Sequence, residues 1–409
     1  MSQALHSTSA SPCSDPLALS GWLFLSSFGI GQSWLIALDA SAHGGFFFLL
    51  PLTLFSLLLV WPLFQTELAM GRRAGRALPE GMSKLTREAD APRFYRAWSW
   101  GSLVALALTM GMALLAAALG LEHLLHALTA TNIHSRPESA SLQGWLGISL
   151  LLCSTGAYFL HDQAWLQQRP FILVATLLLL LGLVTLGVDS GIHQPHWASM
   201  HGGYGWAALR DALLLQATGY GLWFSIGHRM TTSVPIARIT LTPLLISLCS
   251  VALMIPVTSM ATDTIFHPIS IDSLNSIGLE LNYLGMFPSA LFHGILFVGG
   301  ILALVGLAEP LYISLAEQGL SLRLARLAVH ILAIFMAIAL LIPVVLTLRT
   351  GLILALVLVL SIFAGWTMKI SHLRKSLQLS NELFYNLLRI SIRILLPLAL
   401  IGFGIGSLF

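Results

Sequence analysis

Long apolar runs follow one another along almost the whole chain, separated by short polar connections. Each run is at least 17 residues long and shows no strict alternation of apolar and polar positions, which indicates membrane-spanning helices rather than strands. The runs cover residues 17–38, 46–70, 98–126, 144–160, 168–188, 207–228, 238–262, 288–316, 322–346, 350–369 and 383–406. We therefore expect an all-α membrane protein with eleven transmembrane helices.

Positive charges are concentrated in alternate connections. Connections on the cytoplasmic side of a membrane protein are enriched in Lys and Arg. Fifteen of the twenty Lys and Arg residues fall on one side: Arg72, Arg73, Arg76, Lys84, Arg87, Arg93, Arg96, Arg169, Arg229, Arg238, Arg323, Arg326, Lys369, Arg374 and Lys375. The opposite connections contain only Arg136 and Arg349. This asymmetry predicts a cytoplasmic N-terminus and, after eleven spans, a C-terminus on the other side.

Composition narrows the class of protein. Of the 409 residues, 56% are apolar and only 9% are charged, whereas soluble domains carry about 25% charged residues. So few charges exclude an ordinary soluble enzyme, a nucleic-acid-binding protein and a disordered chain. No run combines His, Asp and Glu at metal-ligand spacing or contains a nucleophile elbow, so we do not expect an enzyme.

Glycines interrupt two of the runs at their centres. The first run contains SSFGIGQS at 26–33 and the sixth contains QATGYG at 216–221. Unwound backbone at membrane depth frees N–H and C=O groups that can bind an anionic group or a cation. Because runs one and six begin two successive groups of five, the matched breaks predict an inverted-repeat transporter with its site at the breaks. Close helix packing is the alternative reason for these glycines.

Several motifs resemble the neurotransmitter:sodium symporter family. These are Gly29-Ile30-Gly31, GGFFFLLP at 44–51, Pro62 and ELAMGR at 67–72, which fit the family pattern without a gap. Further matches are ATGYG at 217–221, Glu309-Pro310, Gly365-Trp366 and the segment from Tyr385 to Pro397. The chain resembles a divergent member of the short bacterial branch, whose members have eleven helices.

The resemblance implies the leucine-transporter fold, in which two inverted five-helix repeats have broken helices one and six. The expected parts are a cytoplasmic segment at 1–16, a first repeat at 17–188, an extracellular loop at 189–206, a second repeat at 207–369 with an outer loop at 263–287, and an eleventh-helix region at 370–409. Residues 1–16 contain no Lys or Arg and so lack the positive n-region of a signal peptide. We therefore expect the first run to be retained as a span.

The resemblance also implies a substrate site and two sodium sites between the breaks. The substrate would contact Ser26, Ser27, Gly29, Ile30, Gly31, Leu215, Ala217, Tyr220, Ala303 and Leu307. Sodium site one would use Ser27, Gln32, Leu215 and Thr242. Sodium site two would use Leu25, Phe28, Gly299, Leu302 and Ala303. Glu317 would be the acidic partner of an inner gate.

Some of these positions depart from the family pattern. Leu302 and Ala303 have no side-chain oxygen where the family has hydroxyls, so we expect weak sodium binding at most at the second site. Gln32 replaces an asparagine, and Leu35 replaces the outer-gate arginine. The third run contains no tyrosine to bind the substrate carboxylate; the residues in that neighbourhood are Met112, Leu114 and Ala118.

Two acidic residues inside the runs have open interpretations. Asp211 stands where the family has glutamine, and acids within membranes are usually functional. It would neutralise a cation at the first sodium site or carry a coupling proton, or it would only pair with Arg210 near the outer surface. We interpret Glu67 as a structural hydrogen-bond acceptor, with a proton carrier as the alternative.

We expect a secondary active transporter in the cytoplasmic membrane that moves a small neutral amino acid or a related amine by alternating access. The expected lining carries no charge, which disfavours substrates with charged side chains. Na⁺ is the expected coupling ion, with at most one well-formed site, and we expect no organic cofactor and no nucleic-acid partner. The alternatives are a proton-coupled or uncoupled carrier, and a transporter-derived sensor or receptor that binds without pumping.

Overall fold

Helices form almost all of the part of the chain that can be described. The computed structural model describes residues 32–129, 139–160, 204–230, 235–259, 286–368, 370–377, 379 and 381–406. Its α-helices are α2 (Gln32–Ala42), α3 (Leu49–Phe55), α4 (Trp61–Ala74), α5 (Leu78–Glu88), α6 (Ala97–Thr129), α7 (Ser139–Leu160), α10 (Tyr204–Leu215), α11 (Leu222–Gly227), α12 (Ile236–Ser259), α14 (Met286–Glu317), α15 (Leu322–Ala339), α16 (Pro343–Ile362), α17 (Ile370–Leu377), α18 (Glu382–Ile390) and α19 (Leu396–Gly406). These ranges contain no strand, so the all-α expectation is confirmed for them.

Short helical turns of other types join or continue the α-helices. The 3₁₀ turns are η3 (Gly45–Phe48) and η5 (Arg93–Arg96), and the π-helical turns are η4 (Ser56–Val60), η7 (Phe363–Thr367) and η8 (Ser391–Leu395). The second apolar run forms one continuous helix, which is made of η3, α3, η4 and α4 in succession. This helix ends where Gly75 adopts φ 60° and its N–H donates to the Gly71 carbonyl at 3.0 Å. A left-handed glycine is a common way to end a helix.

Several of these helices are long and apolar enough to cross a membrane. Six qualify, at Gly45–Ala74, Arg93–His126, Ser289–Glu317, Leu322–Ala339, Pro343–Thr367 and Glu382–Gly404, and shorter apolar helices lie at Trp145–Leu160 and Ile239–Ile255. The chain is thus a multi-pass membrane protein. Residues 1–31, 161–203 and 260–285 lie outside the described residues and include the expected fifth helix and outer loops, so the count of eleven stays a prediction.

One helix boundary differs from the sequence-based expectation. The apolar runs at 322–346 and 350–369 place the boundary between these two helices at 347–349, so that Arg349 falls in an outer connection. In the structure α15 ends at Ala339 and α16 begins at Pro343, so Arg349 lies inside α16 and its assignment to a connection is wrong. Proline suits the first position of a helix, where its missing N–H has no helical partner to lose. Here the proline, not the charge, marks the helix start.

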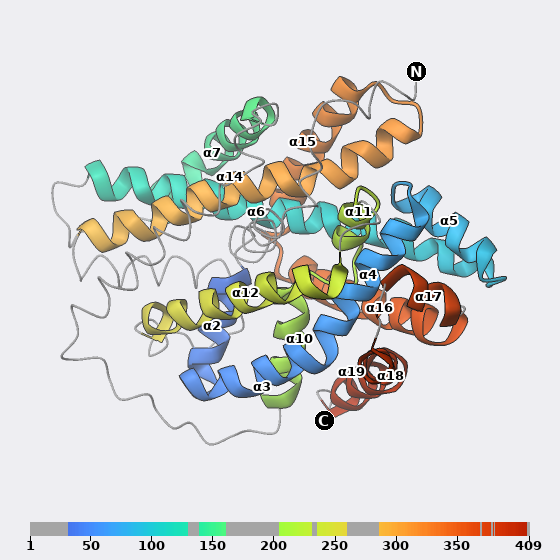
Figure 1. Ribbon diagram of the computed structural model, residues 1–409. Coiled ribbons are helices and arrows are strands. Elements are labelled where there is room, and N and C mark those ends of the chain that lie inside the picture. Colours follow the sequence, from blue (N-terminus) through green and yellow to red (C-terminus); the bar gives the residue numbers. More distant parts are fainter. Residues whose placement is uncertain are drawn as a thin grey trace.

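Helices α6 and α14 form the closest long pair and run side by side across Figure 1. Glycines let their backbones approach. A Cβ on Gly120 would lie 2.6 Å from the Phe297 nitrogen and 2.8 Å from the His293 carbonyl oxygen, and a Cβ on Gly300 would lie 2.8 Å from the Ala113 carbonyl oxygen. Small residues at such crossings are the usual basis of helix packing in membranes.

A second close contact joins α4 to α11. A Cβ on Gly71 would lie 2.0 Å from the Phe224 carbonyl oxygen, and a Cβ on Gly227 would lie 2.3 Å from the Leu68 carbonyl oxygen. The two backbones therefore touch directly at two points one helical turn apart on α11. This contact fixes the short helix α11 on the long helix α4.

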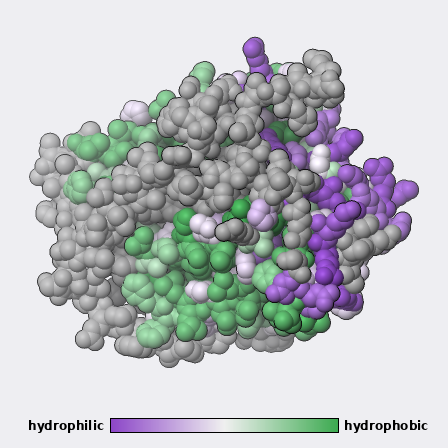
Figure 2. Space-filling model, in the orientation of Figure 1, coloured by the Kyte–Doolittle hydropathy of each residue, from purple (hydrophilic) through white to green (hydrophobic). Residues whose placement is uncertain are grey.

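The surface divides into an apolar part and a polar end. Figure 2 shows hydrophobic residues over its lower middle and hydrophilic residues gathered on the right, where α5 and α17 lie in Figure 1. Exposed cations on these elements and beside them include Arg87, Arg93, Arg374 and Lys375. The Arg72 guanidinium donates to the Ser376 carbonyl and so joins α4 to α17. This end corresponds to the cation-rich side expected from the connections.

Candidate functional site

The predicted interruption of the sixth run is present. Helix α10 ends at Leu215 and α11 begins at Leu222. Between them Ala217, Gly219 and Gly221 have positive φ angles of 49°, 86° and 92°. For a residue with a side chain, such as Ala217, a left-handed conformation costs about 1–2 kcal/mol, so the surrounding contacts must hold it in place. The glycines at 219 and 221 avoid that cost.

Glu67 of α4 holds the break in place. Its carboxylate accepts hydrogen bonds from the backbone N–H groups of Gly219 at 2.6 Å, Gly221 at 2.8 Å and Phe224 at 3.4 Å, and the side chain is fully buried. These donors come from the break and from the first turn of α11, whose N–H groups have no partner within the helix. Glu67 therefore acts as the structural acceptor that the sequence suggested.

Two indole groups occupy carbonyls that the break sets free. Trp98 of α6 donates to the carbonyls of Gly219 at 3.2 Å and Leu356 at 3.1 Å, which ties the break to α16. Trp223 donates to the Gln216 carbonyl at 2.7 Å. The Gly219 and Gln216 carbonyls therefore each already accept a hydrogen bond from the protein, which leaves one lone pair on each oxygen.

The predicted substrate residues of the second repeat all face the interior. Leu215, Ala217 and Tyr220 are fully buried at the break. Ala303 and Leu307 of α14 are each 2% exposed, and α14 contacts α11. The helix-one candidates lie outside the described residues: Ser26, Ser27, Gly29, Ile30 and Gly31. The structure thus describes half of the expected lining, with three residues at the break and two buried on α14, and their role in binding stays a prediction.

The residues expected at sodium site one do not all converge. Leu215 is buried, but Thr242 is exposed on α12, because the buried face of this helix passes through Ile239, Pro243 and Ser247 instead. Ser27 and the side chain of Gln32 lie outside the described part of the chain. The use of Thr242 as a ligand stays a prediction that its exposure does not favour.

Sequence reasoning missed a polar contact on the buried face of α12. The Gln216 amide donates to the Ser247 hydroxyl at 2.6 Å, and both side chains are fully buried. Within the described part of the chain, the Gln216 Oε1 atom and the Thr218 hydroxyl have no hydrogen-bond partner. Helical spacing counted from Ile236 would have selected Ser247 over Thr242.

The described half of sodium site two is apolar. Gly299, Leu302 and Ala303 are buried in α14, while Leu25 and Phe28 lie outside the described residues. Along α14 the nearest side-chain oxygens on either side belong to Ser289, whose hydroxyl lies 3.3 Å from His293 Nδ1, and to Glu309, which forms an ion pair with Arg229 at 2.7 Å. The interior of α14 between them offers a cation no side-chain oxygen near Ala303.

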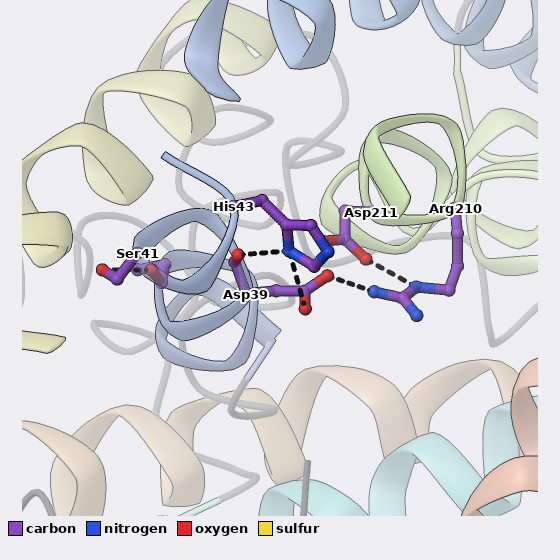
Figure 3. A network of polar contacts seen from close by, with 6 residues as sticks. Asp39, Ser41, His43, Arg210 and Asp211 are labelled. Carbon is purple, nitrogen blue, oxygen red and sulfur yellow. Dashed lines mark hydrogen bonds and ion pairs between the residues drawn. The ribbon is translucent and has the colours of Figure 1, made fainter. Parts of the chain in front are cut away.

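Charged residues cluster between α2 and α10 (Figure 3). Arg210 donates to Asp211 at 2.8 Å and also to Asp39 of α2, while His43 lies 3.4 Å from the Asp39 carboxylate. Asp211 is 1% exposed, and its Oδ2 atom has no hydrogen-bond partner in the described part of the chain. The pairing of Asp211 with Arg210 is present, and it extends across two helices. Leu35, where the family's outer-gate arginine is expected, is buried.

Glu317 ends α14 and contacts the polar end of the molecule. Its carboxylate accepts a hydrogen bond from the Ala77 N–H at 3.2 Å, at the start of α5, where a negative charge is favourable. The nearby Arg76 forms an ion pair with Glu80 at 2.5 Å, and this hydrogen bond raises the pKa of Arg76 above its ordinary value. Glu317 thus fixes the turn before α5, and Arg76 is held mainly by Glu80.

Comparison with known proteins identifies the fold. No family model matches the chain, and no curated protein matches it. Among solved structures it is similar to the crystal structure of MhsT in complex with L-phenylalanine, with a TM-score of 0.79 and 16% sequence identity over 96% of this chain and 98% of that one. MhsT has the leucine-transporter fold. The expectation of this fold, with a broken sixth helix, is therefore confirmed.

Proposed function

We propose that the chain is a divergent member of the neurotransmitter:sodium symporter family and carries a neutral amino acid across the membrane by alternating access. The α10–α11 break supports this most strongly. A strained, fully buried interruption of a membrane helix costs free energy, and such strain is concentrated at functional sites. The likeness to MhsT over nearly the whole chain adds support, since the solved complex holds L-phenylalanine. This function requires no enzymatic step.

We further propose that sodium coupling is weak. The second site lacks oxygen ligands at Leu302 and Ala303, and sodium prefers oxygen ligands. Asp211 is the candidate to take part in coupling, because two carboxylates share Arg210 and one Asp211 oxygen is left without a described partner. A proton-coupled or uncoupled carrier is the second candidate, favoured by the same missing oxygens.

The proposed location is the cytoplasmic membrane, with the N-terminus inside. The cation-rich end at α5 and α17 supports this orientation, because positive connections stay in the cytoplasm. Labelling of single cysteines with a membrane-impermeant reagent tests it. A cysteine at Ser83 on α5 should be protected in intact cells and react after permeabilisation, and labelling in intact cells would reverse the orientation.

Transport is tested with the purified chain in proteoliposomes. Uptake of a radiolabelled panel of the twenty L-amino acids is measured with an inward sodium gradient, with a proton gradient and with neither. Accumulation of a neutral amino acid driven by either gradient supports the carrier. Equilibration without accumulation indicates an uncoupled carrier, and saturable binding without uptake indicates a sensor or receptor. No binding and no uptake of any panel member would overturn the proposal.

A further inference from the structure

Arg349 is a deeply buried cation for which the broken helices give no reason. It lies in the second turn of α16 and is 2% exposed, and no other Lys or Arg whose side chain the structure describes is buried to that degree. A charge inside a membrane span is costly, and such residues face the interior and mark functional sites. Arg349 is therefore a candidate for a role in the site itself.

The neighbours of Arg349 come from two other elements. Its Nη2 atom donates to the hydroxyl of Thr109 on α6 at 3.4 Å, and its guanidinium interacts electrostatically with Tyr220 of the break. Thr109 and Tyr220 are themselves fully buried. The guanidinium thus lies where α6, α16 and the break meet.

Packing along α6 places this junction at the level of the predicted substrate residues. Gly300 of α14 packs on Ala113 of α6, and the two helices run in opposite directions, because Gly120 packs on His293. One turn beyond these contacts, Ala303 of α14 therefore comes level with Thr109 of α6. Arg349, Thr109, Tyr220 and Ala303 consequently lie around the same depth of the bundle.

Arginine at this junction suits one kind of ligand group. Its planar guanidinium binds a carboxylate through two parallel hydrogen bonds and stays charged when buried. The third helix lacks the tyrosine that would bind the substrate carboxylate in the resembling family, while Thr109 on that same helix contacts Arg349.

We propose that Arg349 binds the carboxylate of the transported amino acid and that Thr109 and Tyr220 position its guanidinium. This inference rests on the proposed transport function and sharpens it. The substrate would need a carboxylate, so amines that lack one are excluded. The negative charge of the substrate carboxylate would be neutralised by Arg349 rather than by sodium alone.

The test compares an amino acid with the amine that differs from it by the carboxylate alone. Binding of the twenty L-amino acids to the purified full-length protein is measured by scintillation proximity, and the strongest binder is paired with its decarboxylated amine. The wild type should bind the amino acid roughly 10- to 100-fold more tightly than the amine, as expected for one charged hydrogen-bonded contact. Equal binding of the two by the wild type would overturn the inference.

Substitution then assigns the preference to Arg349. Arg349→Gln should weaken amino-acid binding roughly 10- to 100-fold and leave the amine unchanged, whereas Arg349→Lys, which keeps the charge but loses the planar fork, should give an intermediate loss. The matched control is Arg393→Gln, which removes an arginine stacked 4.0 Å over the Trp366 ring and should leave both ligands unchanged. Thermal unfolding in detergent verifies that each variant is folded.

The outcomes separate this inference from the proposed function. If the wild type binds and discriminates but Arg349→Gln weakens amino acid and amine equally, Arg349 has only a structural role and the inference fails while the transporter stands. If Arg349→Gln does not fold, Arg349→Lys decides, because an unchanged preference in that variant contradicts the inference. A wild type that binds no amino acid would overturn the proposed function itself.

Discussion

The break between α10 and α11 and the middle of α14 are two sides of the same predicted site, and they are built in opposite ways. At the break, Glu67 accepts from three backbone N–H groups, and two tryptophans donate to the carbonyls of Gln216 and Gly219. Around Ala303, α14 presents only apolar side chains and glycine. The scaffold that maintains the break is therefore complete, whereas the oxygen atoms that would bind a second cation are missing. The structure of the break and the binding of a second cation can therefore be lost separately.

The largest expected effect follows from removing the acid that caps the break. Glu67→Ala leaves three buried N–H groups without their acceptor, and each lost bond to a charged group costs about 1.5–3 kcal/mol. We expect little folded protein and no ligand binding. Size-exclusion chromatography and thermal unfolding in detergent measure this.

The matched control is Glu80→Gln on α5, which breaks a solvent-exposed ion pair with Arg76 and should leave the thermal unfolding of the protein almost unchanged. A Glu67→Ala protein as stable as Glu80→Gln would show that the break does not depend on its cap.

Next in size is a methyl group added inside the break. A Cβ on Gly219 would lie 2.4 Å from the Val357 Cγ2 atom, and the φ angle of 86° strains any side chain. We expect Gly219→Ala to lower the free energy of unfolding by about 2–4 kcal/mol through clash and strain. Adding Val357→Ala should remove the clash with the new methyl group but leave the backbone strain at position 219.

Gly351→Ala is the control for the substitution at Gly219, because a Cβ on this helical glycine meets nothing within 4 Å. It should be neutral or stabilising by up to about 1 kcal/mol. If the double variant is no more stable than Gly219→Ala alone, the clash with α16 does not contribute.

A smaller effect is expected at the ionic cluster beside the break. Asp211→Asn removes one of the two carboxylates that share Arg210, so if Asp211 takes part in coupling, the dependence of uptake on sodium or on pH should shift. Stability should change by about 1 kcal/mol. Uptake against both ions at several pH values provides the measurement.

Asp39→Asn is the companion variant, since Asp39 shares the same arginine but is not adjacent to it in the chain. If both variants leave the two dependences unchanged, Asp211 serves only the ion pair.

The smallest effect tests the apolar side of the comparison. Leu302→Thr combined with Ala303→Ser places two hydroxyls where the resembling family has them, and we expect sodium to strengthen amino-acid binding a few-fold more than in the wild type. Ile301→Thr, on the same turn but only partly buried, is the control and should not respond. An identical sodium response in all three proteins would show that side-chain oxygens on α14 do not limit coupling.

Local sequence patterns predicted the features that depend on local chemistry. The glycines of 216–221 predict the break, because it follows from short-range backbone requirements. The acceptor at Glu67 is predicted only by the likeness of ELAMGR to the family motif, since the groups that donate to it lie in a distant part of the chain. The matched breaks indicated an inverted-repeat transporter, and the resemblance of the motifs to the symporter family implied the leucine-transporter fold.

The features that depend on helix rotation and on exact helix ends were not predicted. Thr242 and Ser247 both lie on α12, and only the packed helix shows that Ser247 faces Gln216. The apolar runs assign Arg349 to an outer connection because charges usually mark connections, yet the packing of α6 and α16 gives it an interior place. A uniformly apolar membrane helix carries little information about which face is inside.

The direct contact of α4 with α11 also has a mechanical consequence. Backbone packed on backbone at Gly71 and Gly227 leaves no room for these two helices to slide past each other. Glu67 of α4 also accepts from the N–H groups of Gly219 and Gly221, so the second half of the break is attached to the same helix. Helix α4, the end of the break and α11 therefore form one mechanical unit, and a force on any of the three is transmitted to the other two.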